Sequence, residues 1–227
     1  MIVAAGITAD GTKRVLGLRQ GATENAAVCV ALLEDLQGRG LDTSRPALLV
    51  LDGAKALHAA AKRVWGPNGV IQRCQVHKMR NILAKLPRAM QGQMKRLVHQ
   101  VFRASSHAQA LKRGRALIAQ FRDRYPAAME CLERDLEECV TYLRFPSVHH
   151  IRIRTTNRLE RLNGEGRRRT KVIPRFPTER SCLSLLFASL VTASKRWRGV
   201  KITPAAIKQL QLLRAETTST SSQKAVA

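Results

Sequence analysis

Ala47-Leu48-Leu49-Val50-Leu51-Asp52-Gly53 is the segment from which the fold class is best inferred. Its five-residue apolar run predicts a buried strand, and the strand ends at a carboxylate. A strand-terminating Asp-Gly turn fits the same residues. Because ligands in open α/β sheets gather at the C-terminal ends of the strands, Asp52 is also a candidate catalytic residue.

The segments on either side of this strand alternate between strand-like and helix-like patterns. Residues 1–8 and 14–18 are strand-like and flank Asp10-Gly11, as the arms of a hairpin flank its turn. Thr23 is placed to cap a following helix. After a further helix, Val70-Ile71 resumes strand character. This alternation predicts an α/β sheet.

A wholly helical block follows, from about residue 78 to residue 144. Its apolar residues form two stripes at helical spacing, which indicate a core of packed helices. The stripes consist of Met94, Leu97, Val98, Val101 and Phe102, and of Met129, Leu132, Leu136, Val140 and Leu143.

The remainder of the chain predicts further helices and a polar tail. Thr178 begins one helix, Thr203-Pro204 opens a last short one, and residues 217–227 are predicted to be disordered. The expected organisation is a first part of the core at residues 1–77, a helical insertion at 78–147, returning core helices at 148–200, and a short helix with a tail at 201–227.

A second candidate carboxylate lies far downstream in a basic stretch. Between Arg152 and Arg175 the only acids are Glu160 and Glu165, against nine Lys or Arg. Glu165 lies between two glycines, which favours a loop, so Glu160 is the better candidate. An acid held among so many cations suits a metal ligand that faces a polyanion. The alternative is structural, because Asn157 followed three residues later by Glu160 resembles a helix-capping box.

The basic residues around Glu160 are candidates for contacts with phosphate groups. On a helix that starts after Asn157, the side chains of Glu160, Asn163 and Arg167 share one face. The alternative for the cations is a solvated helix face. The candidates are Arg154, Arg158, Arg161, Arg167, Arg168, Arg169 and Lys171.

The composition is consistent with a DNA partner. The formal net charge is +24 over 227 residues and the isoelectric point is about 11.3, which predicts affinity for phosphate with a steep salt dependence. Aromatic residues make up only 4%, so stacking on bases is not the expected mode of binding. The hydrophobic fraction of 44% is enough for a folded core. A generic basic RNA-binding protein fits the charge as well.

The cysteines and apolar segments predict a reduced protein with no membrane span, in the cytoplasm and associated with the nucleoid. The five cysteines are odd in number and irregular in spacing, which argues against a disulfide framework. Cys74 and His77 have the spacing of half a zinc site, with His149-His150 and Cys182 as distant candidates for the rest. Packing beside a strand is the expected role of Cys74.

Four separated segments together resemble the Mutator-type transposases of bacterial insertion sequences. They occur in the family's order and spacing, and the resemblance covers roughly residues 1–214. The segments are Val15–Leu18 with Gly21–Asn25, Leu51–Leu57, Gln72–Asn81, and Thr155–Glu160.

The resemblance implies a DDE catalytic triad on a ribonuclease-H-like fold, with Asp52 as its second acid and Glu160 as its third. Two Mg²⁺ or Mn²⁺ ions would be the cofactors. Double-stranded DNA, as transposon ends and target, would be the substrate of a homo-oligomer. The roles of Cys74, His77, Asn157 and Asn163 in these motifs stay open.

The sequence also departs from the family pattern. The first catalytic Asp of the family precedes a hairpin like the one that opens this chain, and Asp10 is a poor substitute because it lies in the turn. We therefore expect a ribonuclease-H-like mixed sheet without its first strand, interrupted by an all-α insertion. An N-terminally truncated transposase with little cleavage activity of its own is expected, and the alternative is an inactive DNA-binding remnant.

Overall fold

The structure is a computed structural model that describes residues 1–21 and 25–226, with side chains described for all of these except residues 158 and 220–226. Thr23, predicted to cap a helix, lies outside the described residues. The helix that follows is capped by Asn25, whose Oδ1 accepts a hydrogen bond from the backbone N–H of Val28 at 2.9 Å.

The chain divides into two compact units. The first comprises Met1–Ser44, Lys55–Gly66 and Asn157–Pro204, and the second comprises Arg45–Ala54, Pro67–Thr156 and Ala205–Ala227. Asp52 therefore belongs to the second unit and Glu160 to the first. The four-part organisation expected from the sequence stays a prediction.

The first unit combines a hairpin with four long helices in the described residues. Its elements are β1 (Ile2–Ile7), β2 (Lys13–Arg19), α1 (Ala26–Gly38), α2 (Lys55–Trp65), α9 (Asn157–Lys171) and α10 (Glu179–Ser194).

The predicted hairpin is confirmed, with β1 antiparallel to β2. Asp10 holds its turn, because its carboxylate accepts hydrogen bonds from the backbone N–H and the hydroxyl of Thr12 at 3.0 and 2.9 Å. Hydrogen bonds from the Thr8 hydroxyl and from Thr12 lower the pKa of Asp10 to about 2. Asp10 is thus a turn residue, as predicted.

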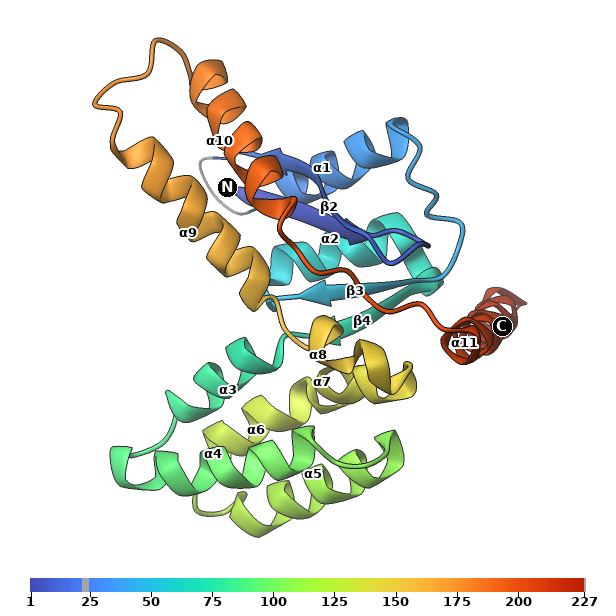
Figure 1. The fold of residues 1–227 in the computed structure, drawn as a ribbon. Coiled ribbons are helices and arrows are strands. Elements are labelled where there is room, and N and C mark those ends of the chain that lie inside the picture. The colour runs from blue at the N-terminus through green and yellow to red at the C-terminus, as the bar shows by residue number, and fades with distance from the viewer. Residues whose placement is uncertain (22–24, 227) are drawn as a thin grey trace. The chain divides into compact units, whose positions relative to one another are not determined.

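Alternate residues of β1 face two separate helix layers (Figure 1). Ile2 and Ala4 pack in a cluster with residues of α1 and α2. Met1 and Val3 pack in another cluster with residues of α9 and α10. Since successive residues of a strand point to opposite faces, the hairpin is covered by helices on both sides.

Helix α9 runs without a break through Gly164, Glu165 and Gly166, so the predicted loop around Glu165 is wrong. Packing provides the physical reason. Gly166 is buried, and a Cβ atom at this position would overlap the side chain of Leu186 on α10. Gly166 therefore lets α9 and α10 approach closely, which offsets the low helix propensity of glycine.

The two glycines make a matched pair of variants. Gly164→Ala should stabilise the protein by about 1 kcal/mol, because a Cβ there meets nothing within 4 Å and alanine favours the helix. Gly166→Ala should instead destabilise it by about 1–3 kcal/mol, because the added methyl overfills the contact with Leu186. Urea unfolding of both variants would measure the difference, and equal effects would contradict the packing explanation.

The second unit contains a pair of parallel strands and the helical block. Its strands are β3 (Ala47–Leu51) and β4 (Gly69–Arg73), the latter preceded by the short 3₁₀ helix η1 (Gly66–Asn68). Its helices are α3 (Gln75–Leu83), α4 (Arg88–Phe102), α5 (His107–Phe121), α6 (Pro126–Arg134), α7 (Leu136–Val140), η2 (Thr141–Arg144), η3 (Ser147–His149), α8 (His150–Ile153) and α11 (Pro204–Val226).

The helical block has a core of its own. Both predicted stripes enter one cluster of buried residues, in which Met94, Val98, Met129 and Leu132 are fully buried. The predicted strands are confirmed too, since β3 and β4 pair in parallel with Leu51 opposite Arg73. The fold is mixed α/β, and a single sheet that includes all four strands is not seen in the described residues.

The C-terminal segment differs from the prediction. A short helix and a disordered tail were expected, whereas α11 continues from Pro204 to Val226. It contacts the end of the helical block, because Gln209 donates to the carbonyl of Arg144 at 3.0 Å and Arg144 pairs with Glu216 at 3.2 Å. The tail lacks further proline or glycine, so nothing local ends the helix.

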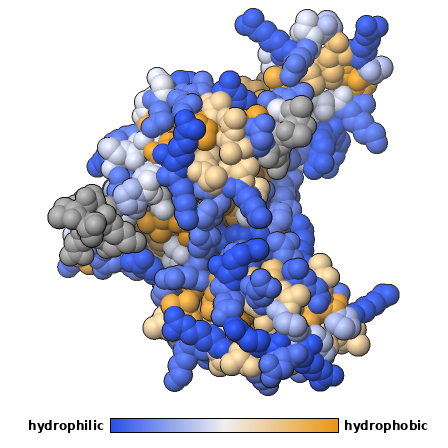
Figure 2. All heavy atoms as spheres, turned by 180° about the vertical axis from the view of Figure 1, so that it is seen from behind, coloured by the Kyte–Doolittle hydropathy of each residue, from blue (hydrophilic) through white to orange (hydrophobic). Residues whose placement is uncertain are grey.

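Hydrophilic residues cover most of the face shown in Figure 2, with smaller hydrophobic areas between them. Among the described helices, none has the length and apolar character that are needed to span a bilayer.

Candidate active site

Asp52 follows the last residue of β3 and is held in a tight turn. Its Oδ1 accepts a hydrogen bond from the backbone N–H of Ala54 at 3.0 Å. Gly53 has φ of +93°, a conformation that side chains disfavour. The carboxylate of Asp52 is therefore oriented by its own backbone at the C-terminal end of a parallel strand, as the sequence predicted for its location.

The turn rests on a buried arginine that the sequence did not single out. The guanidinium of Arg73 donates from Nη1 to the carbonyl oxygen of Asp52. It also occupies the space where a Cβ of residue 53 would lie. Arg73 ends β4 opposite Leu51, so the parallel register brings its side chain beside the residue that follows Leu51.

Arg73 belongs to a cluster of buried charges. Asp135, between α6 and α7, accepts from Lys78 Nζ at 2.6 Å and from Arg73 Nε at 3.4 Å. The Lys78 side chain is 0% exposed and that of Arg73 is 5% exposed. Burial raises the pKa of Asp135, but the hydrogen bonds and charges of Lys78 and Arg134 together outweigh it and hold the pKa below its ordinary value. Asp135 therefore stays ionised at neutral pH.

Glu160 lies in the first turn of α9, partly buried. On the same helix, the Oδ1 atoms of Asn157 and Asn163 are buried and accept no hydrogen bond from the described residues. The capping-box alternative needs Asn157 Oδ1 to accept a bond from the helix backbone, so the structure disfavours it. The region around Glu160 is instead a helix face with buried oxygen atoms.

These oxygen atoms fit the chemistry of a divalent cation. Mg²⁺ and Mn²⁺ prefer carboxylate and amide oxygens, which Glu160, Asn157 and Asn163 supply in the first unit and Asp52 supplies in the second. No group of three or more His, Cys, Asp and Glu side chains placed to hold a metal ion occurs among the described residues.

Cys74 and His77 both contact Thr156. Cys74 Sγ accepts hydrogen bonds from the backbone N–H and the hydroxyl of Thr156, both at 3.3 Å. The Thr156 hydroxyl lies 3.4 Å from His77 Nδ1. Cys74 is fully buried, in line with the packing role predicted for it. The motif thereby anchors the residue that immediately precedes α9.

The other zinc candidates have neighbours of their own. His149 is buried, and His150 Nε2 lies 2.7 Å from the carbonyl oxygen of Phe145. Cys182, on α10 of the first unit, is a free thiol.

Most of the predicted phosphate-binding residues are exposed on α9. They are Arg161, Arg167, Arg168, Arg169 and Lys171. Arg168 also pairs with Glu165 at 2.9 Å. Arg154 differs, since it is half-buried in the second unit beside Tyr142, where it opposes the rise that burial causes in the pKa of that tyrosine. The side chain of Arg158 is outside those that the structure describes.

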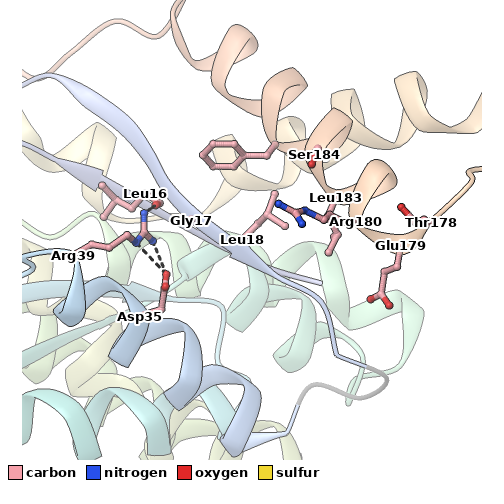
Figure 3. A pocket seen from close by; sticks show the side chains of 11 residues that line it. Leu16, Gly17, Leu18, Asp35, Arg39, Thr178, Glu179, Arg180, Leu183 and Ser184 are labelled. Atoms are coloured by element: carbon pink, nitrogen blue, oxygen red, sulfur yellow. Dashed lines mark hydrogen bonds and ion pairs between the residues drawn. The ribbon is translucent and has the colours of Figure 1, made fainter.

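A separate pocket of about 720 Å³ lies in the first unit between β2, α1 and α10 (Figure 3). The ion pair between Arg39 and Asp35, at 2.7 Å, lies on one side of it, and Leu183 and Arg180 of α10 lie on the other. None of the sequence-predicted site residues lines this pocket.

The chain belongs to the Mutator family of transposases. A family model described as "Transposase, Mutator family" matches residues 1–199, which include both candidate acids. The resemblance noted from the sequence segments is thereby confirmed.

Individual relatives are transposases of insertion sequences. The chain is 36% identical over 200 residues to the transposase for insertion sequence element IST2 of Acidithiobacillus ferrooxidans, a match that covers 88% of this chain and 67% of that protein. It is 34% identical over 197 residues to the ISRM5 transposase of Rhizobium meliloti, covering 87% and 49%. For the IS406 transposase of Burkholderia multivorans the identity is 35% over 205 residues, covering 89% and 52%. The chain thus spans about two thirds of the first relative and about half of the other two.

Proposed function

We propose that this chain carries the second and third catalytic acids of a DDE-type DNA transposase, Asp52 and Glu160, on a ribonuclease-H-like core. Membership in the transposase family is the observation that carries the proposal. Two local features support it, namely the position of Asp52 at the end of β3 and the position of Glu160 among buried oxygen atoms on α9.

The reaction is phosphoryl transfer on DNA. Asp52 and Glu160 would hold divalent cations, which would supply activation of the attacking water or 3′-hydroxyl and stabilisation of the leaving oxygen. Asp52 contributes a carboxylate that the Ala54 amide has already oriented, so little ordering remains for ligand binding. Glu160 contributes the second carboxylate, and Asn157 and Asn163 offer neutral oxygens beside it.

The exposed cations of α9 serve to bind the DNA backbone. Arg forms charge-assisted, often bidentate hydrogen bonds with phosphate, which position a duplex without reading its sequence. The net charge of +24 adds a long-range attraction that raises the association rate. We propose that α9 holds duplex DNA against Glu160, which the same helix carries.

Replacing Arg167, Arg168 and Arg169 together with alanine should weaken DNA binding by about a hundredfold near 0.15 M salt, equally for unrelated sequences. The control is the triple variant of Lys112, Arg113 and Arg115, three exposed cations of α5 in the helical block. It removes the same charge. Fluorescence anisotropy would compare the two, and equal losses would mean that the total charge, and not α9, determines binding.

The second candidate function is DNA binding without catalysis, which the basic composition supports. A strand-cleavage assay distinguishes it from a transposase. DNA that carries the ends of the cognate insertion sequence is incubated with the protein and Mg²⁺ or Mn²⁺, with EDTA as the control. Metal-dependent cutting supports the transposase proposal. The assay is run on the 227 residues and on a version extended upstream in frame. If both bind DNA tightly and neither cuts it, the result favours the non-catalytic DNA binder.

A further inference from the structure

We propose that Asp135, a residue of the helical block, is a positioning residue for Asp52 and acts through Arg73. The helical block would then be part of the scaffold of the active site and not only a spacer between two acids. The inference rests on the proposed function of Asp52, whereas the contacts that carry it all lie within the second unit.

Arg73 contacts the turn that contains Asp52. Arg73 donates to the Asp52 carbonyl and fills the space above Gly53. The Asp52 carboxylate in turn accepts from the Ala54 amide two residues on. Because carbonyl and carboxylate belong to the same residue, a displacement of the guanidinium alters the turn that orients the carboxylate.

Asp135 forms an ion pair with Arg73. Arg73 is almost fully buried, and a buried cation needs a partner anion. Asp135 supplies that anion and shares it with Lys78. The exposed Arg134 pairs with the other carboxylate oxygen of Asp135 at 3.0 Å, so Asp135 is the one anion shared by three cations in these contacts, two of them buried. Loss of the Asp135 charge would therefore drive the two buried cations apart, and Arg73 has the Asp52 turn on its other side.

Hydrogen bonds between uncharged groups also attach the helical block to the end of β4. Gln72 and Gln75 both donate to the carbonyl of Cys139, at 3.0 and 2.9 Å, and the amide of Tyr142 donates to Gln72 Oε1 at 2.7 Å. Gln72 is 0% exposed. These bonds fix the segment after Asp135 to the residues on both sides of Arg73, so Asp135 is delivered to a defined place.

The Ala54 amide provides a direct readout, since its hydrogen bond reports the position of the Asp52 carboxylate. We expect Asp135→Asn to lower the protection of this amide against hydrogen exchange, measured by NMR, by at least about tenfold. Glu133→Gln is the matched control, because it neutralises an acid of the same segment whose pair with Arg122, at 2.6 Å, is exposed. It should leave the protection of Ala54 unchanged.

Two further variants separate positioning from general charge balance. Arg73→Met removes the contact with the turn while Lys78 and Asp135 remain paired, and it should expose the Ala54 amide as Asp135→Asn does. Lys78→Met leaves Arg73 paired with Asp135 and should preserve protection. The amide of Leu132, in the core of the helical block, reports global opening. If Asp135→Asn does not fold, the protection of the Ala54 amide in Arg73→Met and in Lys78→Met is compared, and a loss in Arg73→Met alone supports the proposal.

The proposal is overturned if Ala54 keeps its protection in Arg73→Met or Asp135→Asn. It is also overturned if the loss at Leu132 is as large as at Ala54, or if Lys78→Met exposes Ala54 as strongly as Arg73→Met. None of these measurements needs catalysis. A transposase activity that survives Asp52→Ala would refute the proposed function and leave the exchange result standing.

Discussion

Raising the salt concentration from about 50 to about 200 mM should weaken the binding of this chain to duplex DNA by about three to five orders of magnitude. The physical reason is the release of condensed counterions as cations of the protein replace them at the phosphates. A loss of this size corresponds to about six to ten phosphate contacts. Aromatic residues are scarce, so no large salt-independent stacking contribution is expected to mask it.

Fluorescence anisotropy with two duplexes of equal length and unrelated sequence would measure how the DNA affinity depends on salt concentration. The slope of log affinity against log salt should be the same for both duplexes. For the variant of Arg167, Arg168 and Arg169, the slope should be smaller by roughly 0.9 for each phosphate contact that is lost. A flat salt response in the wild-type protein would contradict backbone-dominated binding.

Substitution of Asp52 or Glu160 is expected to have a large effect on strand cleavage. Asp52→Ala and Glu160→Ala should each lower metal-dependent strand cleavage by at least about three orders of magnitude, because each removes a proposed metal ligand, and a bound metal contributes several kcal/mol to the transition state. Cleavage of DNA with the cognate transposon ends would be measured for the 227 residues and for their in-frame upstream extension. DNA affinity should change little in both variants, since the phosphate-binding cations remain.

Asp10→Ala is the control for these acid variants. The carboxylate of Asp10 is engaged by Thr8 and Thr12 in the turn of the hairpin, and these contacts lower its pKa to about 2. Its removal should leave cleavage unchanged. If Asp10→Ala abolishes cleavage while Glu160→Ala does not, the assignment of the acids from the family motifs is wrong.

The local elements of the fold follow from sequence patterns that act over a few residues. The apolar run before Asp52 formed the expected strand, and the two stripes of the helical block formed the expected core. Even the turn role of Asp10 followed from its place between two strand-like runs. In each case the pattern that predicts the element lies within a short segment of the chain.

Features that depend on contacts distant in sequence were not predicted. Gly166 is helical because Leu186, on another helix, packs where its side chain would be, and no local signal shows this. Arg73 and Asp135 are separated by the helices α3 to α6, and only the folded helical block brings them together. The parallel register that places Arg73 beside Asp52 becomes visible only when β3 and β4 are paired.

We propose that Asp52 and Glu160 bind the same pair of metal ions, and anomalous diffraction from crystals grown with Mn²⁺ and duplex DNA would locate those ions. We predict Mn²⁺ peaks between the two side chains, with the carboxylates within about 10 Å of each other, since two ions roughly 4 Å apart must lie between them. Carboxylates on opposite sides of the protein, or Mn²⁺ bound by other residues alone, would contradict the proposed catalytic site.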